Sequence, residues 1–105
     1  MNEYKVTTYS EEETLAIAQN IESEKFPNMI ITLNGDLGSG KTVFTKGLAH
    51  AMGIDSVTSP TFNIVKEYLP KERLDVKIKI VDENTRVLIF IRHGEKYEQL
   101  CEAAL

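Results

Sequence analysis

Apolar and polar residues follow two successive patterns along the N-terminal part of the chain. Residues 3–9 alternate weakly, as expected of an edge strand. A capping box then begins at Ser10, whose hydroxyl is expected to accept a hydrogen bond from the Glu13 amide while the Glu13 carboxylate reaches back. The box predicts the start of a helix, which Pro27 closes. Four residues share the apolar face of this helix: Thr14, Ile17, Ala18 and Ile21.

A short apolar segment, residues 29–33, follows without a charged residue. Its β-branched composition predicts a strand covered on both faces, as in a parallel sheet. A glycine-rich loop comes next, and the apolar positions after it predict a helix that ends at Gly53. His50 falls on the polar face of that helix and is interpreted as solvated. The apolar face combines Phe44, Leu48, Ala51 and Met52.

The C-terminal half carries the pattern of extended, antiparallel structure. Pro60 disfavours helix at Ser59, so residues 57–65 are predicted to form a loop that runs into a strand at 62–68. Two segments then alternate on either side of a turn at 82–84, which predicts an antiparallel hairpin with one exposed face. The apolar positions of the hairpin are Leu74, Val76, Ile78 and Ile80 before the turn, and Val87, Ile89 and Ile91 after it.

The last segment, residues 95–105, is predicted to be a helix. His93 precedes it and is interpreted as a surface residue with too few possible partners for a metal site. Cys101 is the only cysteine, so an internal disulfide is impossible and a zinc cluster is disfavoured. We interpret it as an inert core thiol, the alternative being a reactive one. Its helix face also carries Tyr97, Leu100 and Ala104.

The composition indicates one folded domain, residues 1–105. A chain of 105 residues can bury one core, and its 42% apolar and 27% charged residues are typical of a globular protein. The formal net charge of -4 excludes a basic surface that would hold nucleic acid by phosphate contacts alone. No apolar run approaches the ~20 residues of a membrane span and no signal region follows the N-terminus, so a cytoplasmic protein is expected.

The loop NGDLGSGKT matches the phosphate-loop pattern of two glycines, a lysine and a hydroxyl at fixed spacing. Its glycines allow successive amides to point inward, and the following helix N-terminus adds partial positive charge. Lys41 is predicted to contact the β and γ phosphates of ATP, and the Thr42 hydroxyl to bind Mg²⁺. A turn that only reverses the chain is the alternative, but a strand before and a helix after favour a nucleotide site. The predicted nucleotide-binding residues are Gly35, Asp36, Leu37, Gly38, Ser39, Gly40, Lys41 and Thr42.

Lys41 and Asp36 are the candidate catalytic residues of this loop. Asp36 either orients water or Mg²⁺ or hydrogen-bonds the loop amides. Phosphoryl transfer also requires an acidic residue at the end of a neighbouring buried strand. Asp82 is the one local candidate, yet it follows a half-exposed strand and its surroundings are typical of a turn. The acid expected of an ATPase is therefore missing from the pattern.

Together with the segments around it, the loop resembles that of the bacterial tRNA threonylcarbamoyladenosine biosynthesis ATPases, the TsaE family. The resemblance lies in residues 33–42, in 44–48, and in the SPTF motif within 57–62, which Glu67 and Tyr68 follow. The loop joined to SPTF is far more specific than the loop alone. The chain before the join resembles the N-terminal half of the family, and the remainder resembles its C-terminal end.

Between Tyr68 and Leu69 the family has several dozen further residues, including a His-x-Asp-x-Tyr-Arg stretch that holds the expected metal-side acid and a Glu-Trp pair. The resemblance implies a P-loop NTPase-like α/β fold with a mainly parallel sheet, flanking helices and a C-terminal antiparallel hairpin, truncated in the middle. Because strand 29–33 would lose neighbours, we expect either residues omitted at this join or a sheet completed by another chain. A Cα separation far above about 3.8 Å at the join would indicate omission.

The resemblance implies ATP and Mg²⁺ as cofactors. It also implies two partner proteins of the threonylcarbamoyl-transfer complex, with tRNA engaged only indirectly. Thr61 would sense the γ-phosphate or Mg²⁺ as a second metal-side residue, in a loop shaped by Ser59 and Pro60; a plain loop before a strand is the alternative. Glu13 and Thr14 would approach the base.

Three functions follow from these observations. The first is the ATPase subunit of the machinery that makes threonylcarbamoyladenosine next to the tRNA anticodon, active on bound ATP with its partners. The second is a nucleotide-dependent binding module that has lost hydrolysis with its central segment. The third, a small P-loop kinase, is disfavoured because the sequence contains no identifiable arginine-rich lid or acceptor pocket.

Overall fold

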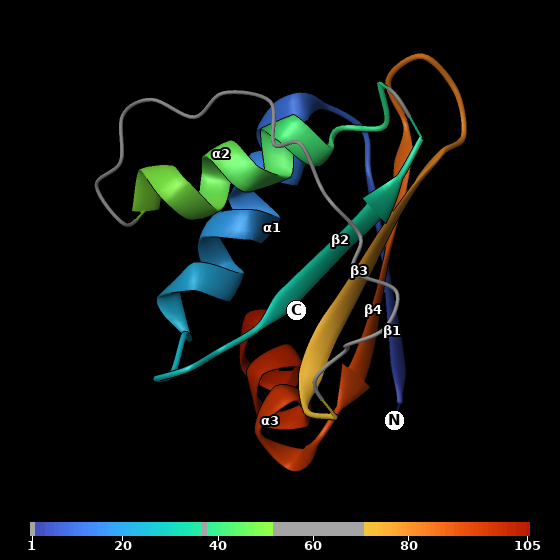
Figure 1. Ribbon diagram of the computed structural model, residues 1–105. Coiled ribbons are helices and arrows are strands. Elements are labelled where there is room, and N and C mark those ends of the chain that lie inside the picture. The colour runs from blue at the N-terminus through green and yellow to red at the C-terminus, as the bar shows by residue number, and fades with distance from the viewer. Residues whose placement is uncertain (1, 37, 52–70) are drawn as a thin grey trace.

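The structure is a computed structural model that describes residues 2–36, 38–51 and 71–105. Within these residues, four strands form one sheet in the order β1-β4-β3-β2, accompanied by three helices (Figure 1). The strands are β1 (Glu3–Thr8), β2 (Ile31–Gly35), β3 (Arg73–Ile80) and β4 (Arg86–His93). The helices are α1 (Glu11–Ser23), α2 (Lys41–Ala51) and α3 (Glu95–Ala104).

The sheet is mixed. β2 and β3 are parallel, with Ile31 opposite Leu74 and Gly35 opposite Ile78. β4 is antiparallel to both of its neighbours, β3 and β1. The predicted α/β fold and its C-terminal antiparallel hairpin are therefore confirmed. Parallel pairing, which was expected to predominate, is confined among the described strands to β2 and β3.

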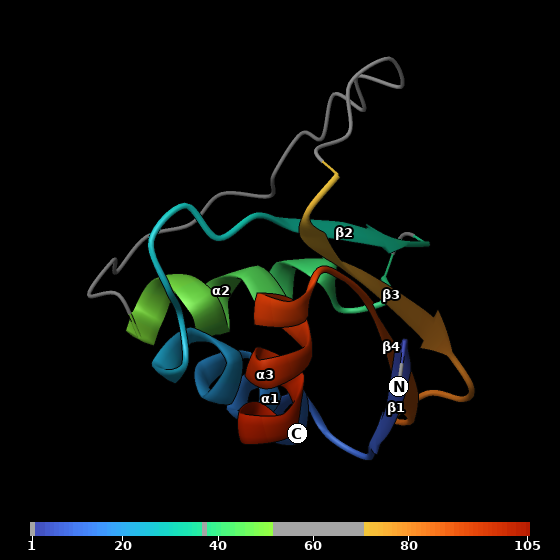
Figure 2. The same ribbon diagram turned by 90° about the horizontal axis from the view of Figure 1, so that it is seen from below.

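All three helices lie on one face of the sheet, as Figure 2 shows from below. α1 and α2 pack closely, since a Cβ added at Gly47 would lie 2.7 Å from the Cβ of Ala18. Burial of apolar side chains between this helical layer and the sheet is the main favourable term in folding. The core is formed by Ala18, Ile21, Phe44, Leu74, Val76, Ile78, Leu88, Phe90, Tyr97, Leu100 and Cys101.

The hairpin uses a different face of β4 from the one the alternation indicated. Val76 pairs with Phe90 and Ile78 with Leu88, and all four side chains are buried in the core. The predicted apolar positions of β4, residues 87, 89 and 91, therefore project from the opposite side of the sheet. β4 is apolar on both faces, so a period of two cannot tell which face meets the helices.

The start of α1 confirms the predicted capping box, with one change. The Glu13 amide donates to the Ser10 hydroxyl at 3.2 Å. The Glu13 carboxylate accepts from the amide of Tyr9, at 2.9 Å, and not from that of Ser10. The buried hydroxyls of Thr8 and Thr14 share a 2.7 Å hydrogen bond, which fastens β1 to the helix.

The predicted strand at 29–33 is observed two residues later, as β2. It was expected to be covered on both faces, but residues 31–33 are half-buried and Ile30 is 39% exposed. The reason is its position at the end of the described sheet, beside β3, with helices on one face only.

Several predictions concern segments outside the described residues. They are the helix end at 52–53, the loop and strand at 57–68, and the join between residues 68 and 69. His50 belongs to α2, but its side chain is not described.

Cys101 is a core thiol, as predicted. It is 1% exposed, and burial, with a smaller contribution from the negative charge of Glu102, raises the pKa of the thiol to about 11. A thiol of this kind is protonated at neutral pH and a poor nucleophile. The described helices include none whose length and hydropathy would suit a membrane crossing.

A polar cluster that the sequence did not reveal lies around Asp75 on β3. Its carboxylate accepts hydrogen bonds from the Thr32 hydroxyl and from Arg73 Nε at 2.8 Å. Its second oxygen lies 2.8 Å from His93 Nε2. Burial raises the pKa of Asp75, but the hydrogen bonds from Thr32, Arg73 and His93 outweigh burial and lower it overall. The cluster joins β2, β3 and the end of β4.

Asp75→Asn is expected to lower the free energy of unfolding by about 1 kcal/mol at pH 7, because it removes the charge that three partners, Thr32, Arg73 and His93, share. A lowered folded pKa stabilises the protein above the unfolded pKa of about 3.9 and loses this effect as the pH falls through the folded value. The free energy of unfolding of the variant should therefore fall less steeply than that of wild type as the pH is lowered. Urea unfolding between pH 7 and pH 3 measures both, with the exposed Glu83→Gln as control. Parallel pH profiles for wild type and Asp75→Asn would contradict the expectation.

Candidate functional site

The predicted phosphate loop connects the end of β2 to the start of α2. Gly38 and Gly40 have positive φ angles of 80° and 105°, which L side chains rarely adopt. A Cβ at either position would meet no atom of the described residues within 4 Å, so it is the backbone conformation that requires glycine there. The Ser39 amide donates to the Asp36 carbonyl at 3.0 Å and closes the turn. Leu37, also a predicted site residue, lies outside the described residues.

Gly35 is required for a different reason. A Cβ at this position would lie 2.5 Å from the Ser39 hydroxyl oxygen and 2.9 Å from the Ile78 carbonyl oxygen. Both distances are below any real carbon contact, so β3 and the loop can approach β2 this closely only at glycine. Ser39 is fully buried, and its hydroxyl has no hydrogen-bond partner within the described part of the chain.

α2 begins directly after the loop. The Gly40 carbonyl accepts from the Phe44 amide at 2.9 Å, and the Thr45 hydroxyl donates to the Lys41 carbonyl at 2.8 Å. The first turn of α2 contains no acidic residue, whereas the first turns of α1 and α3 do. The partial positive charge of the α2 N-terminus is therefore not offset by carboxylates of its own first turn. Lys41 and Thr42, both half-buried, open this helix as predicted.

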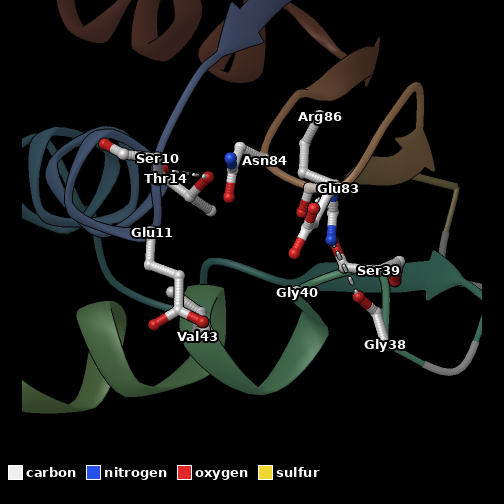
Figure 3. A pocket seen from close by; sticks show the side chains of 10 residues that line it. All are labelled: Ser10, Glu11, Thr14, Gly38, Ser39, Gly40, Val43, Glu83, Asn84 and Arg86. Carbon is white, nitrogen blue, oxygen red and sulfur yellow. Dashed lines mark hydrogen bonds between the residues drawn. The ribbon is translucent and has the colours of Figure 1, made fainter.

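A hollow of about 100 Å³ lies between the loop, the start of α1 and the β3–β4 turn (Figure 3). Thr14, predicted to approach the base, lines this hollow beside Gly38 and Gly40. The Glu13 carboxylate instead caps the Tyr9 amide. The structure thus brings Thr14 to the loop and holds Glu13 in the cap.

Asp36 is exposed at the end of β2. Its carbonyl, rather than its carboxylate, holds the loop turn. Asp36 lines a second, more open hollow at the ends of β2 and β3, together with Lys77 and Lys79. Thr61, Ser59 and the rest of the SPTF motif lie outside the described residues.

Asp82 is a turn residue, as its surroundings indicated. Its Oδ1 atom accepts hydrogen bonds from the amides of Asn84, at 3.0 Å, and Thr85, at 2.9 Å. Hydrogen bonds from the Thr85 side chain and from these two amides lower the pKa of Asp82. Within residues 2–36, 38–51 and 71–105 no group of three acidic, histidine or cysteine side chains can hold a metal ion.

Arg86, at the start of β4, is the residue of this region that the sequence did not reveal. Its Nε atom donates to the Ser39 carbonyl at 3.1 Å and its Nη2 atom to the Gly38 carbonyl at 3.3 Å, as the dashed lines of Figure 3 show. The two segments are 47 residues apart, and no local spacing links them. Only the return of the hairpin beside the loop brings them together.

A glycine-rich loop between a strand and a helix, on a sheet with helical cover, defines an α/β protein of the P-loop-like kind. The family described as "Threonylcarbamoyl adenosine biosynthesis protein TsaE" matches residues 8–85, and the chain belongs to this family. A TsaE from Bacillus subtilis is 34% identical over 148 aligned positions, which cover 97% of this chain and 94% of that protein. A TsaE from Aquifex aeolicus is 42% identical over 67 residues, 61% of this chain and 50% of that protein.

The crystal structure of Bacillus subtilis YdiB superposes with a TM-score of 0.84 at 30% identity, over 95% of this chain and 92% of that one. The 148 positions of the Bacillus subtilis alignment exceed the 105 residues of this chain by 43. At least that many positions of the relative therefore have no counterpart here. This agrees with the predicted absence of a central segment.

Proposed function

We propose that this chain binds Mg²⁺-ATP through residues 35–42 and acts as the nucleotide-binding subunit of the tRNA threonylcarbamoyladenosine machinery. The observation that carries the proposal is the loop itself. Two glycines in the left-handed region and a helix that begins at once, without an acid in its first turn, form the anion-binding arrangement of a strand–loop–helix unit.

Three residues of the loop, and Thr61 outside it, have chemical roles in this proposal. Lys41 holds the β and γ phosphates by its charge, and the Thr42 hydroxyl is the protein ligand to Mg²⁺. Bound Mg²⁺-ATP supplies the transferable phosphoryl group and a metal that neutralises its charge. Asp36 either orients water near the metal or supports the loop, and Thr61 is proposed as the residue that senses the γ-phosphate.

The family membership supports the cellular role. The relatives are named for the biosynthesis of tRNA threonylcarbamoyladenosine. We propose that this chain works in the cytoplasm with two other proteins of the threonylcarbamoyl-transfer complex, and that tRNA is engaged through them. The acidic net charge of -4 supports indirect contact with tRNA.

A second candidate, a nucleotide-dependent binding module without hydrolysis, rests on one observation. Asp82, the local candidate for the metal-side acid, is committed to the amides of Asn84 and Thr85 in an exposed turn. An ATPase needs an acid directed at the metal and a group that positions water. ATP turnover measured with and without the partner proteins separates the two candidates.

The isolated chain is expected to hydrolyse ATP no faster than its Lys41→Ala variant, because Asp82, the local candidate for that acid, is held by the amides of its turn. Release of inorganic phosphate at saturating Mg²⁺-ATP measures it, with a buffer blank as background. Turnover that depends on Lys41 would contradict the expectation and show that another acid of the chain completes the site. Absence of any saturable binding of Mg²⁺-ATP or Mg²⁺-ADP would overturn the proposed function itself.

A further inference from the structure

The guanidinium group of Arg86 bridges the β3–β4 turn and the glycine loop. Its Nη1 atom donates to three carbonyls of the turn: those of Asp82 at 2.6 Å, Thr85 at 3.0 Å and Glu83 at 3.3 Å. Its two other nitrogens donate to the Ser39 and Gly38 carbonyls of the loop. All five of these acceptors are backbone carbonyls, so these hydrogen bonds orient peptide groups.

These bonds fix the direction of two successive peptide units in the loop. The carbonyl and the N–H of a trans peptide point in opposite directions. Because Arg86 holds the Ser39 carbonyl, the Gly40 N–H points away from Arg86. The Gly38–Ser39 peptide is held at both ends, by Arg86 at its carbonyl and by the Asp36 carbonyl at its N–H. Without these bonds, a glycine-rich loop would lose a large conformational entropy when it becomes ordered.

We infer that Arg86 is a positioning residue that preorganises the glycine loop for a phosphate group. The inference rests on the proposed nucleotide binding. It says that Arg86 holds the loop in its binding conformation before the nucleotide arrives. Ordering a flexible loop on binding reduces affinity, whereas a loop already held in its bound shape avoids that cost. The fork of an arginine is needed, since one side chain must reach two loop carbonyls and the turn together.

The simpler account is that Arg86 only stabilises the turn, and a matched variant separates the two. Asp82→Asn removes the negative charge that strengthens the hydrogen bonds Asp82 accepts from the Asn84 and Thr85 amides, and so weakens the turn, yet keeps the Asp82 carbonyl to which Arg86 donates. Arg86→Gln removes the bridge. Arg86→Lys retains the charge without the fork, and serves if the glutamine variant does not fold.

Two measurements test the inference. In the ligand-free protein, hydrogen exchange of the Ser39 amide should be at least tenfold faster in Arg86→Gln than in wild type or Asp82→Asn. Calorimetry should show Mg²⁺-ADP binding weakened about tenfold in Arg86→Gln, and by less than twofold in Asp82→Asn. Arg86→Lys should resemble the glutamine variant, since it lacks the fork.

The outcomes are distinguishable. If wild type binds Mg²⁺-ADP and Arg86→Gln binds it equally well, the inference is overturned while the proposed function stands. Unchanged exchange of the Ser39 amide in Arg86→Gln also overturns it, whatever the nucleotide affinity. Equal losses of affinity in Arg86→Gln and Asp82→Asn assign the effect to turn stability and overturn the positioning role. If wild type binds no nucleotide, the proposed function fails, and the inferred role in phosphate binding fails with it.

Discussion

Lys41→Ala is expected to weaken the binding of Mg²⁺-ATP and Mg²⁺-ADP by at least about 2 kcal/mol, a rise in Kd of about 30-fold. Lys41 is the first residue of α2 and is half-buried next to the glycine loop. In the proposed site, a charge in that position would attract the phosphates directly and add to the partial positive charge of the helix N-terminus. Removing it leaves the loop amides as the main source of attraction.

Isothermal titration calorimetry on wild type and variant measures this change. Lys46→Ala is the matched control, because Lys46 carries the same charge on the same helix but is exposed and lies outside the phosphate-loop pattern. The control should bind within about twofold of wild type. Equal affinities for wild type and Lys41→Ala would remove residue 41 from the binding site and contradict the proposed arrangement.

Phe44→Ala should give the largest loss of stability, about 3–5 kcal/mol. Phe44 is fully buried, and its ring centroid lies 6.2 Å from that of Phe90 on β4. It lies in the first turn of α2 and fastens the start of this helix to the sheet. A domain of this size has a total stability of about 5–15 kcal/mol, so this one substitution should remove a large part of it, and a protein at the lower end of that range would be largely unfolded at 25 °C.

Urea unfolding followed by far-UV circular dichroism measures the loss. Phe44→Leu, which keeps most of the apolar volume, is expected to cost less than about 1.5 kcal/mol and allows a comparison in folded protein. Lys46→Ala, on the exposed side of the same helix, should stay within about 0.5 kcal/mol of wild type. A loss below about 1 kcal/mol in Phe44→Ala would mean that α2 is not docked through this ring.

The sequence predicted best the features that depend on neighbouring residues. The Ser10 cap of the Glu13 amide and the turn around Asp82 each join residues two or three apart. The glycines of the loop, predicted to let successive amides point inward, also depend on local structure, because positive φ is a property of single residues and Gly38 and Gly40 adopt it without strain. The family could be inferred early for a similar reason, since its motifs are short and contiguous.

Features that join distant segments did not follow from the pattern. β4 is apolar on both faces, so only the docked helices decide that Leu88 and Phe90 join the core beneath them. Residues 87, 89 and 91 lie on the other face of the sheet, where Ile89 is also buried. The position of β2 at the end of the described sheet likewise depends on which strands pair. No residue of 29–33 contains that information.

The sequence by itself therefore determined the α/β class, the capped first helix, the glycine loop with Lys41 and Thr42 at the head of α2, and the family. Tertiary structure alone decided that Arg86 holds the loop carbonyls from 47 residues away and that the Asp75 carboxylate accepts a hydrogen bond from Thr32, 43 residues away. Local spacing controls hydrogen bonds within one turn of chain, whereas these contacts exist only after β3 and β4 have paired beside β2. Their energy comes from burial and donor geometry that the complete sheet creates, and no short window of sequence contains it.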